Sequence, residues 1–107
     1  MNLSIIIPVF NAEKFIKKCL DSICNQKREK KNFEVILIDD CSTDKSVKIL
    51  EKYVKLFKFI KLIKLAKNSG TASSRDAGIK IASGKYLFFV DIDDRLVNKS
   101  IAIILKN

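Results

Sequence analysis

The sequence predicts an α/β fold in which a parallel sheet of about four strands carries helices on both faces. Short, almost continuous apolar runs rich in β-branched residues alternate along the chain with segments of helical periodicity. Runs that are apolar on both faces are typical of strands buried in a parallel sheet. The length of 107 residues allows one domain with a modest core.

The first half of the chain supplies two strands and two helices. Leu3–Val9 is a β-branched run interrupted by a proline, which predicts a buried strand. Asn11 is expected to cap the next helix, with Glu13 in its first turn. After a charged loop, Phe33–Ile38 predicts the second buried strand. Turn and cap residues then lead into a helix expected from Asp44 to Leu56.

The second half supplies two more strands and two more helices. Phe59–Leu65 is ambiguous, because lysines recur as on a helix face, but its apolar alternation favours a strand. A helix of small residues is expected over Thr71–Ser83, ended by Ser83 and Gly84. Tyr86–Val90 is expected to be the most buried strand, and Asn98 to cap a last helix. We expect the strand order 3-2-1-4.

Composition excludes several classes of protein. No apolar run reaches the ~18 residues of a membrane span, and the N-terminus lacks the features of a secretory signal. The absence of His removes the usual zinc ligand sets, and the spacing of Cys19, Cys24 and Cys41 suits a reducing cytoplasm. The net charge of +9 comes mainly from lysines, which favours a solvated basic surface over a nucleic-acid reader.

Carboxylates follow two of the four predicted strands. Asp39 and Asp40 come after the second strand, and residues 91–94 (Asp-Ile-Asp-Asp) come after the fourth. Parallel strands end at one edge of the sheet, where ligands bind beside the point at which strand order reverses. Residues 8–11, at the end of the first strand, would line the same crevice. Clustered carboxylate oxygens select hard cations such as Mg²⁺ or Mn²⁺, which bridge protein carboxylates to phosphate oxygens.

Two further features suit a phosphate beside these acids. The turn at residues 68–70 feeds a helix and would supply free backbone N–H groups. Arg75, on the first turns of that helix, can donate two hydrogen bonds to a phosphate. Plainer structural roles stay open for each element: capping for Asp39 and Asp40, a solvated turn for residues 91–94, and a surface ion pair for Arg75.

Five segments in register resemble family 2 glycosyltransferases of the GT-A fold. They are residues 4–11 (SIIIPVFN), 34–44 (EVILIDDCSTD), 68–70 (NSG), 74–78 (SRDAG) and 82–94 (ASGKYLFFVDIDD). The match in order and spacing covers nearly the whole chain. The resemblance implies a Rossmann-like half-domain that binds a nucleotide-diphosphate sugar, most often a UDP-sugar, with Mg²⁺ or Mn²⁺. It also implies sugar transfer to an acceptor in glycan or cell-envelope polysaccharide synthesis.

The resemblance also implies a role for each matching residue. Asp40 would accept a hydrogen bond from the base, supported by Asp39, and Arg75 would lie near the base or the diphosphate. The nucleobase would be bordered by Pro8, Val9 and Phe10, the ribose side by Asp91 and Ile92, and the metal would be held by Asp93 with help from Asp94. Two local departures from the family pattern are Cys41 in place of Gly and Asp76 in place of Asn, the latter adding a carboxylate beside the phosphate site.

Length is the larger departure from the family. Members usually continue well beyond the Asp-x-Asp-Asp turn, and that later part supplies the acceptor contacts and the catalytic base. We therefore expect residues 1–107 to be the N-terminal, nucleotide-sugar-binding portion, with the acceptor half and the catalytic base outside this chain. Alone it would have little or no activity, and its uncovered apolar surface would favour self-association.

Two other functions compete with this one. A non-catalytic basic module could dock on an anionic membrane or polyanion through the helix face that carries Lys45, Lys48, Lys52 and Lys55. A phosphatase with an aspartate nucleophile is disfavoured, because its acids belong on an early strand. For the transferase we expect a glycan or lipid-linked acceptor, no nucleic-acid partner, and a cytoplasmic location with peripheral contact at the inner face of the membrane.

Overall fold

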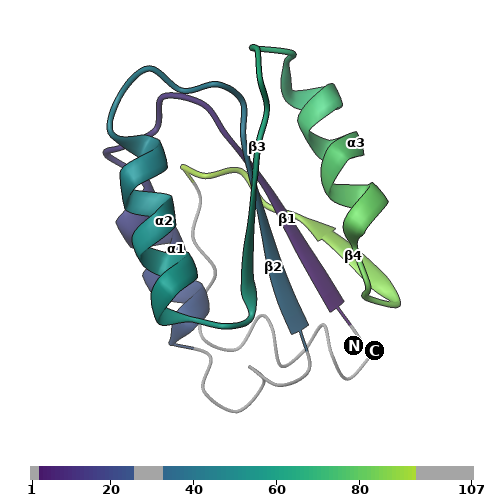
Figure 1. Cartoon of the computed structure of the whole chain (residues 1–107). Coiled ribbons are helices and arrows are strands. Elements are labelled where there is room, and N and C mark those ends of the chain that lie inside the picture. Colours follow the sequence, from purple (N-terminus) through teal and green to yellow (C-terminus); the bar gives the residue numbers. More distant parts are fainter. Residues whose placement is uncertain (1–2, 26–32, 94–107) are drawn as a thin grey trace.

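The predicted α/β fold is confirmed. The computed structural model describes residues 3–25 and 33–93. Its four parallel strands lie in the order β3-β2-β1-β4, as expected. The predicted loop over residues 27–32, the predicted last helix with its cap Asn98, and Asp94 fall outside the described residues. Figure 1 shows the elements, which are β1 (Leu3–Val9), α1 (Ile16–Cys24), β2 (Phe33–Asp39), α2 (Ser46–Leu56), β3 (Ile60–Lys64), α3 (Thr71–Ile81) and β4 (Tyr86–Phe89).

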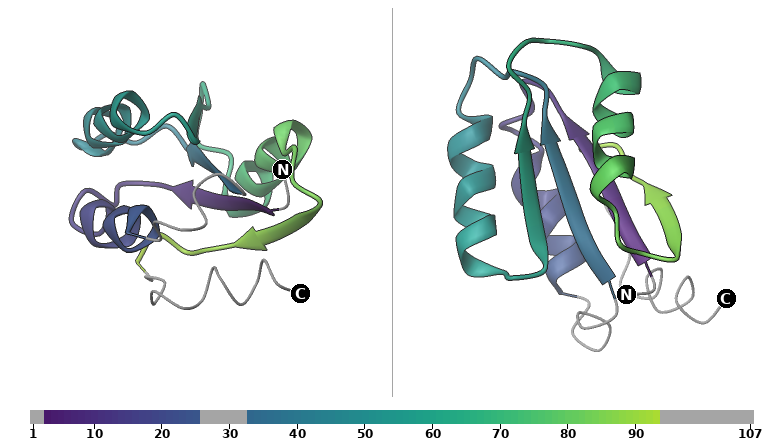
Figure 2. Two further views of the ribbon diagram at one scale, coloured as in Figure 1. Left: turned by 90° about the horizontal axis from the view of Figure 1, so that it is seen from below. Right: turned by 45° about the vertical axis from the view of Figure 1, so that its right-hand side comes forward.

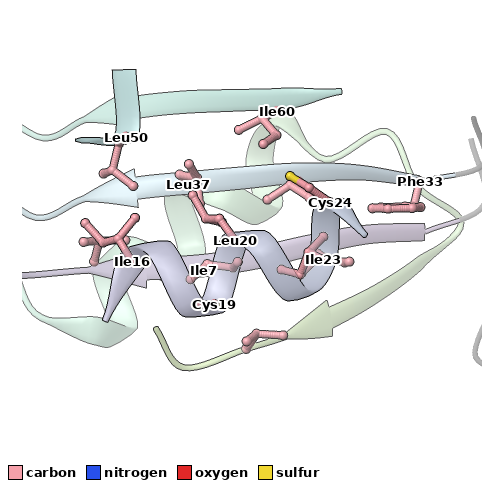
Figure 3. Close-up of a cluster of buried hydrophobic side chains, with 14 of the residues drawn as sticks. Ile7, Ile16, Cys19, Leu20, Ile23, Cys24, Phe33, Leu37, Leu50 and Ile60 are labelled. Atoms are coloured by element: carbon pink, nitrogen blue, oxygen red, sulfur yellow. The ribbon is translucent and has the colours of Figure 1, made fainter. Parts of the chain in front are cut away.

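The sheet is a central layer between helices. Helices α1 and α2 cover one face and α3 covers the other (Figure 2). Alternate side chains of a strand point to opposite faces, so Ile5 and Ile7 of β1 join the core under α1 and α2, whereas Ile6 joins the core under α3. Figure 3 shows the larger core, in which side chains of α1 lie against the sheet, including the buried Cys19 and Cys24.

Helix α1 begins later than the sequence predicts. Its N-cap is Phe15, with no side-chain cap, and no acid occupies its first turn. The expected roles of Asn11 as a cap and of Glu13 in the first turn are therefore wrong. Asn11 instead has a positive φ of 46°, and its Oδ1 accepts the Thr43 N–H at 2.7 Å. A contact to a distant loop has replaced the local cap.

Strand β4 is not the most buried strand, which corrects the sequence-based expectation. It pairs only with β1 among the described strands, so it forms an edge of the sheet. Tyr86, Leu87 and Phe89 are 50%, 40% and 41% exposed. Apolar content predicted burial, but the position of the strand in the sheet decides how much of that surface is covered.

Helix α3 lies close to the sheet at Gly78. A Cβ there would approach the Ile6 and Ile38 side chains to 2.7 and 2.9 Å, so a larger residue would force those side chains or the helix to shift. The helix ends at Ile81 with Ala82 in an extended conformation, so Ser83 and Gly84 do not form its cap. Gly84 N–H instead donates to Ser4 Oγ at 2.7 Å. The ambiguous segment before α3 is a strand, β3.

A buried acid ties the elements together at the amino ends of the strands. Glu34, 1% exposed, accepts hydrogen bonds at 2.6 Å from Ser4 Oγ and from the Ser83 N–H. Lys61 of β3 forms an ion pair with it at 2.9 Å. Burial raises the pKa of Glu34, but the hydrogen bonds from Ser4 and Ser83 and the charge of Lys61 outweigh that effect, so the pKa lies below 4.5.

We expect Glu34→Gln to lower the free energy of unfolding by about 1.5–3 kcal/mol at pH 7, because it removes a charged acceptor. Since the folded pKa is depressed, the contribution of Glu34 is complete above about pH 4.5 and is lost as the pH falls through the folded pKa. Urea unfolding at pH 7 and pH 3 should show the wild-type advantage shrink in acid.

Glu51→Gln is the matched control, because Glu51 pairs with Lys64 at a half-exposed position. Its loss should stay within about 1 kcal/mol. An advantage of wild type over the Glu34 variant that is the same at both pH values would contradict the role given to this carboxylate.

Candidate functional site

The predicted carboxylates gather at the carboxyl edge of the sheet. Val9 at the end of β1 lies beside Asp39 of β2, and Ile6 lies beside Phe89 of β4. Backbone hydrogen bonds continue this alignment past the strands, from Asp40 N–H to the Val9 carbonyl and from Val90 N–H to the Ile6 carbonyl. Residues 39–40 and 91–93 therefore emerge on the two sides of β1 at one edge.

Asp39 organises the loop that follows β2. Its side chain is 2% exposed and accepts the Ser42 hydroxyl at 2.6 Å and the Ser42 N–H at 3.0 Å. Ser42 Oγ in turn accepts the Asn11 N–H at 2.9 Å. Asp39 is thus a buried anchor of the turn, and its contacts reach the loop after β1. It does not cap α2, whose N-cap residue is Lys45.

The loops after β1 and β2 are joined by further hydrogen bonds. Asp44 accepts the Glu13 N–H at 3.2 Å and the Ser46 N–H at 2.9 Å. Ser46 Oγ accepts the Ala12 N–H at 3.0 Å. Burial raises the pKa of Asp44, but the hydrogen bonds from Ser46 and Glu13 outweigh it and lower that pKa. The two loops form one hydrogen-bonded unit beside the sheet edge.

Asp40 holds a third loop in place. It is 4% exposed, and its two oxygens accept the N–H groups of Ser69 and Gly70 at 2.7 and 2.8 Å. Gly70, with a φ of 91°, is the N-cap of α3. The expectation that this turn offers free N–H groups to a phosphate is therefore wrong for these two, because Asp40 already binds them. Asp40 thereby fixes the start of α3 against the end of β2.

Arg75 points toward Asp91, the first acid that follows β4. Its guanidinium lies 3.6 Å from an Asp91 carboxylate oxygen and 5.5 Å from the centre of the Phe89 ring. Arg75 Nε is buried and has no hydrogen-bond partner. Asp91 is 64% exposed, so its pair with Arg75 contributes little to stability and leaves both groups accessible to a ligand.

Two adjoining hollows lie at this edge. A cleft of about 360 Å³ brings the end of β1 together with the acids after β4. A smaller cavity of about 60 Å³ lies beside Asp40 and the first turns of α3. Pro8, Phe10 and Thr71 line both of them, so the hollows adjoin. The cleft is lined by Pro8, Phe10, Asn11, Ala12, Phe15, Thr71, Asp91, Ile92 and Asp93, and the cavity by Pro8, Val9, Phe10, Asp40, Thr71 and Ser74.

Most of the predicted residues line these hollows, and the exceptions are informative. Asp39 lines neither hollow, because its buried carboxylate accepts hydrogen bonds from Ser42 instead. Asp76, expected beside a phosphate, instead lines a groove with Ile63 and Lys80 between β3 and α3. Ser74 and Thr71 were missed, because a small polar residue on a helix carries no signal until the helix is placed against the sheet.

Carboxylates that could bind a hard cation are present, but those in the described residues do not cluster around one metal position. Among residues 3–25 and 33–93, no group of three or more Asp, Glu, Cys or His side chains is placed to hold a metal ion. Asp93 is exposed at the rim of the cleft, and Asp94 lies outside the described residues. One or two carboxylates suit Mg²⁺ or Mn²⁺ when substrate phosphates and water complete the coordination. The donor set fits an ion that arrives with a diphosphate.

Cys41 adds local strain next to Asp40. Its φ of 62° lies in the left-handed region, which costs a residue other than glycine roughly 1–2 kcal/mol. Its Sγ lies 3.7 Å from the Ala66 carbonyl. The neighbouring contacts of Asp39 and Asp40 hold this unfavourable conformation, which shows how firmly the strand end is fixed.

We expect Asp40→Asn to lower the free energy of unfolding by about 1–3 kcal/mol, because an amide NH₂ would face one of the two backbone N–H donors. Asp39→Asn should cost less, because the Ser42 hydroxyl that donates to Asp39 can turn and accept instead. Urea unfolding of both variants measures the difference. A larger loss for the Asp39 variant would contradict the hydrogen-bond roles described for the pair.

Comparison with known proteins places the chain in a family. The family "Glycosyl transferase family 2" matches residues 4–106. A poly(ribitol-phosphate) beta-glucosyltransferase of Bacillus spizizenii is 43% identical over 102 residues, which cover 94% of this chain and 16% of that protein. The poly(ribitol-phosphate) beta-N-acetylglucosaminyltransferase TarS of Staphylococcus aureus is 41% identical over 100 residues, 92% of this chain and 17% of TarS.

Solved structures agree with this placement. The crystal structure of S. aureus TarS 1–349 in complex with UDP-GlcNAc superposes with a TM-score of 0.92 at 36% identity, over 99% of this chain and 30% of that one. A mannosyltransferase of Pyrobaculum calidifontis shares the fold, with a TM-score of 0.87 at 21% identity. The chain thus spans a minor part of these relatives. From the match over residues 4–106 and the likeness to TarS, this chain belongs to glycosyl transferase family 2.

Proposed function

We propose that residues 1–107 are the nucleotide-sugar-binding portion of a glycosyltransferase, and that the donor is a UDP-sugar. The observation that carries the proposal is the cleft of about 360 Å³ shared by Pro8 and Phe10 at the end of β1 and by Asp91 and Asp93 after β4. It combines an aromatic surface with carboxylates at the carboxyl edge, where parallel sheets bind nucleotides. The similar TarS chain was solved with UDP and with UDP-GlcNAc.

In this proposal the ligand lies across both hollows. The nucleobase lies by Pro8, Val9 and Phe10, with one edge toward Asp40 in the smaller cavity. The ribose and diphosphate lie along Asp91 and Ile92. Arg75, already 3.6 Å from Asp91, supplies a positive charge to the phosphates.

The proposal includes a divalent ion held at the diphosphate by Asp93, with Asp94 assisting. Both are hard oxygen donors of the kind that Mg²⁺ and Mn²⁺ prefer. Such an ion neutralises charge on a departing diphosphate. Arg75, paired with Asp91, provides a second positive charge beside the cleft, and the buried Asp39 and Asp40 keep the loops in position around the ligand.

The acceptor in this proposal is a glycan or lipid-linked molecule of cell-envelope polysaccharide synthesis. Its support is the likeness to two poly(ribitol-phosphate) glycosyltransferases. The acceptor contacts and the catalytic base belong, in the same proposal, to parts of the protein beyond this chain. The exposed side chains of β4 supply an apolar face for those parts or for a second copy to cover. Family membership favours the transferase over a non-catalytic module.

Titration of the chain with UDP in the presence of Mn²⁺ should give saturable binding in a calorimeter. Asp93→Ala should weaken it at least about tenfold, the loss expected for one charged contact. Asp76→Ala is the matched control, because that exposed acid lies in a different groove. Absence of saturable binding at millimolar UDP would refute the proposal, and equal effects of the two variants would refute the role of Asp93.

One surface also supports peripheral contact with an anionic membrane. We define the lysine layer as α1, α2 and their flanks, residues 12–25 and 44–58, which cover one face of the sheet (Figure 2). Every charged residue classed as exposed in this layer is a lysine, whereas its acids are partly buried. Leu56, 73% exposed, adds an apolar contact. The lysines are Lys14, Lys17, Lys18, Lys45, Lys48, Lys52, Lys55 and Lys58.

This contact would be superficial rather than spanning. No helix in the described part of the chain is both long enough and apolar enough to cross a bilayer. A basic layer gains about 1 kcal/mol per lysine near an anionic surface, and the gain falls with added salt.

We expect the chain to sediment with vesicles that contain phosphatidylglycerol and not with neutral vesicles. Lys48→Gln with Lys52→Gln should weaken this binding about tenfold or more, because two charges leave the contact face. Lys80→Gln with Lys85→Gln removes equal charge from exposed positions outside the lysine layer and should change it much less. Equal effects of the two pairs would show non-specific attraction and would contradict a defined docking face.

A further inference from the structure

Ser74 carries a buried hydroxyl without a partner. The residue is 0% exposed on the first turns of α3, and its Oγ forms no hydrogen bond. The other polar residues that are buried as a whole in the described part of the chain form hydrogen bonds, such as Ser4 with Glu34 and Ser46 with the Ala12 N–H. A buried hydroxyl left unpaired costs free energy and calls for an explanation.

The hydroxyl lies at a cavity of a suitable size for part of a ligand. The cavity of about 60 Å³ is lined by Ser74 together with Asp40 and the residues that end β1. That volume corresponds to roughly two water molecules at ~30 Å³ each, which is too small for a nucleotide. Since the adjoining cleft of about 360 Å³ shares Pro8 and Phe10, one edge of a ring can enter the cavity while the rest of the ligand stays in the cleft.

Ser74 and Asp40 together offer one donor and one acceptor. The Asp40 carboxylate can only accept hydrogen bonds, and each oxygen, which already receives one backbone N–H, keeps a further lone pair. The Ser74 hydroxyl can donate. The imide edge of uracil presents the N3–H between the carbonyl oxygens O2 and O4, so the N–H matches the carboxylate and O4, the oxygen that cytosine lacks, matches the hydroxyl. Cytosine presents a bare ring nitrogen to the carboxylate, which repels it, and an amino group in place of O4, which cannot accept the hydrogen bond that the hydroxyl donates.

We propose that Ser74 is a specificity-determining residue that selects uracil, by donating its hydroxyl hydrogen bond to uracil O4 while Asp40 accepts the ring N–H. This inference rests on the proposed function, because it assumes that the base of the donor lies in these hollows. A site built to hydrogen-bond a ligand discriminates strongly against analogues that leave its buried groups unpaired.

The test compares UDP with CDP in calorimetric titrations of the whole chain. Ser74→Ala should weaken UDP binding about three- to tenfold, the loss of one neutral hydrogen bond, and leave CDP binding unchanged. The ratio of UDP to CDP affinity should fall by the same factor. The thermal midpoint without ligand should not fall, because the hydroxyl has no partner to lose. Ser73→Ala, at the exposed neighbouring position, should change neither affinity.

The outcomes separate this inference from the function on which it rests. If wild type binds UDP but Ser74→Ala leaves the UDP to CDP ratio unchanged, Ser74 does not select the base, and donor binding stands. If Ser74→Ala lowers the thermal midpoint, the hydroxyl has a structural partner and the premise is wrong. If wild type binds neither nucleotide, the proposed function fails, and this inference fails with it.

Discussion

The two adjacent carboxylates at the end of β2 are the constraint on which the rest of the site depends. Asp39 binds both donors of Ser42, and Asp40 binds the N–H groups of Ser69 and Gly70. Side chains of successive residues on an extended strand point in opposite directions, so the pair reaches loops on both sides of the sheet. One anchors the unit formed by the loops after β1 and β2, and the other anchors the start of α3. Their buried charges are tolerated because donors surround them.

At the opposite end of the sheet, a single buried acid likewise holds several elements together through the hydrogen bonds that it accepts. Glu34 collects donors from β1, from the segment after α3 and from Lys61 of β3. Buried carboxylates thus lie at both ends of β2, while the middle of that strand is held by apolar packing. Fixing the amino ends this way keeps the carboxyl edge in register. Asp91 and Asp93 can then remain exposed, because they are not needed to hold the fold together.

The hollows at the carboxyl edge follow from the way α3 meets the sheet. Gly78 lets the helix approach Ile6 and Ile38 closely, and this brings the first turns of α3 beside Asp40 and Pro8. Arg75 and Ser74, on successive positions of that helix, then face different parts of the site. Arg75 reaches Asp91 after β4, whereas Ser74 lies at the cavity beside Asp40. One close helix contact therefore positions a charged and a neutral donor.

The sequence by itself determined the element types, the strand order and the edge at which the acids gather. These follow from local apolar patterns and from the rule that parallel strands end together. Tertiary structure decided which partner each polar group has. Asn11 accepts a hydrogen bond from Thr43 rather than capping α1. Asp40 accepts the Gly70 N–H, which the sequence suggested was free to bind a phosphate. These hydrogen bonds join residues about 30 positions apart, so no local sequence pattern predicts them. The exposure of β4 was likewise decided by its place at the sheet edge, because composition measures how apolar a strand is and not whether anything covers it.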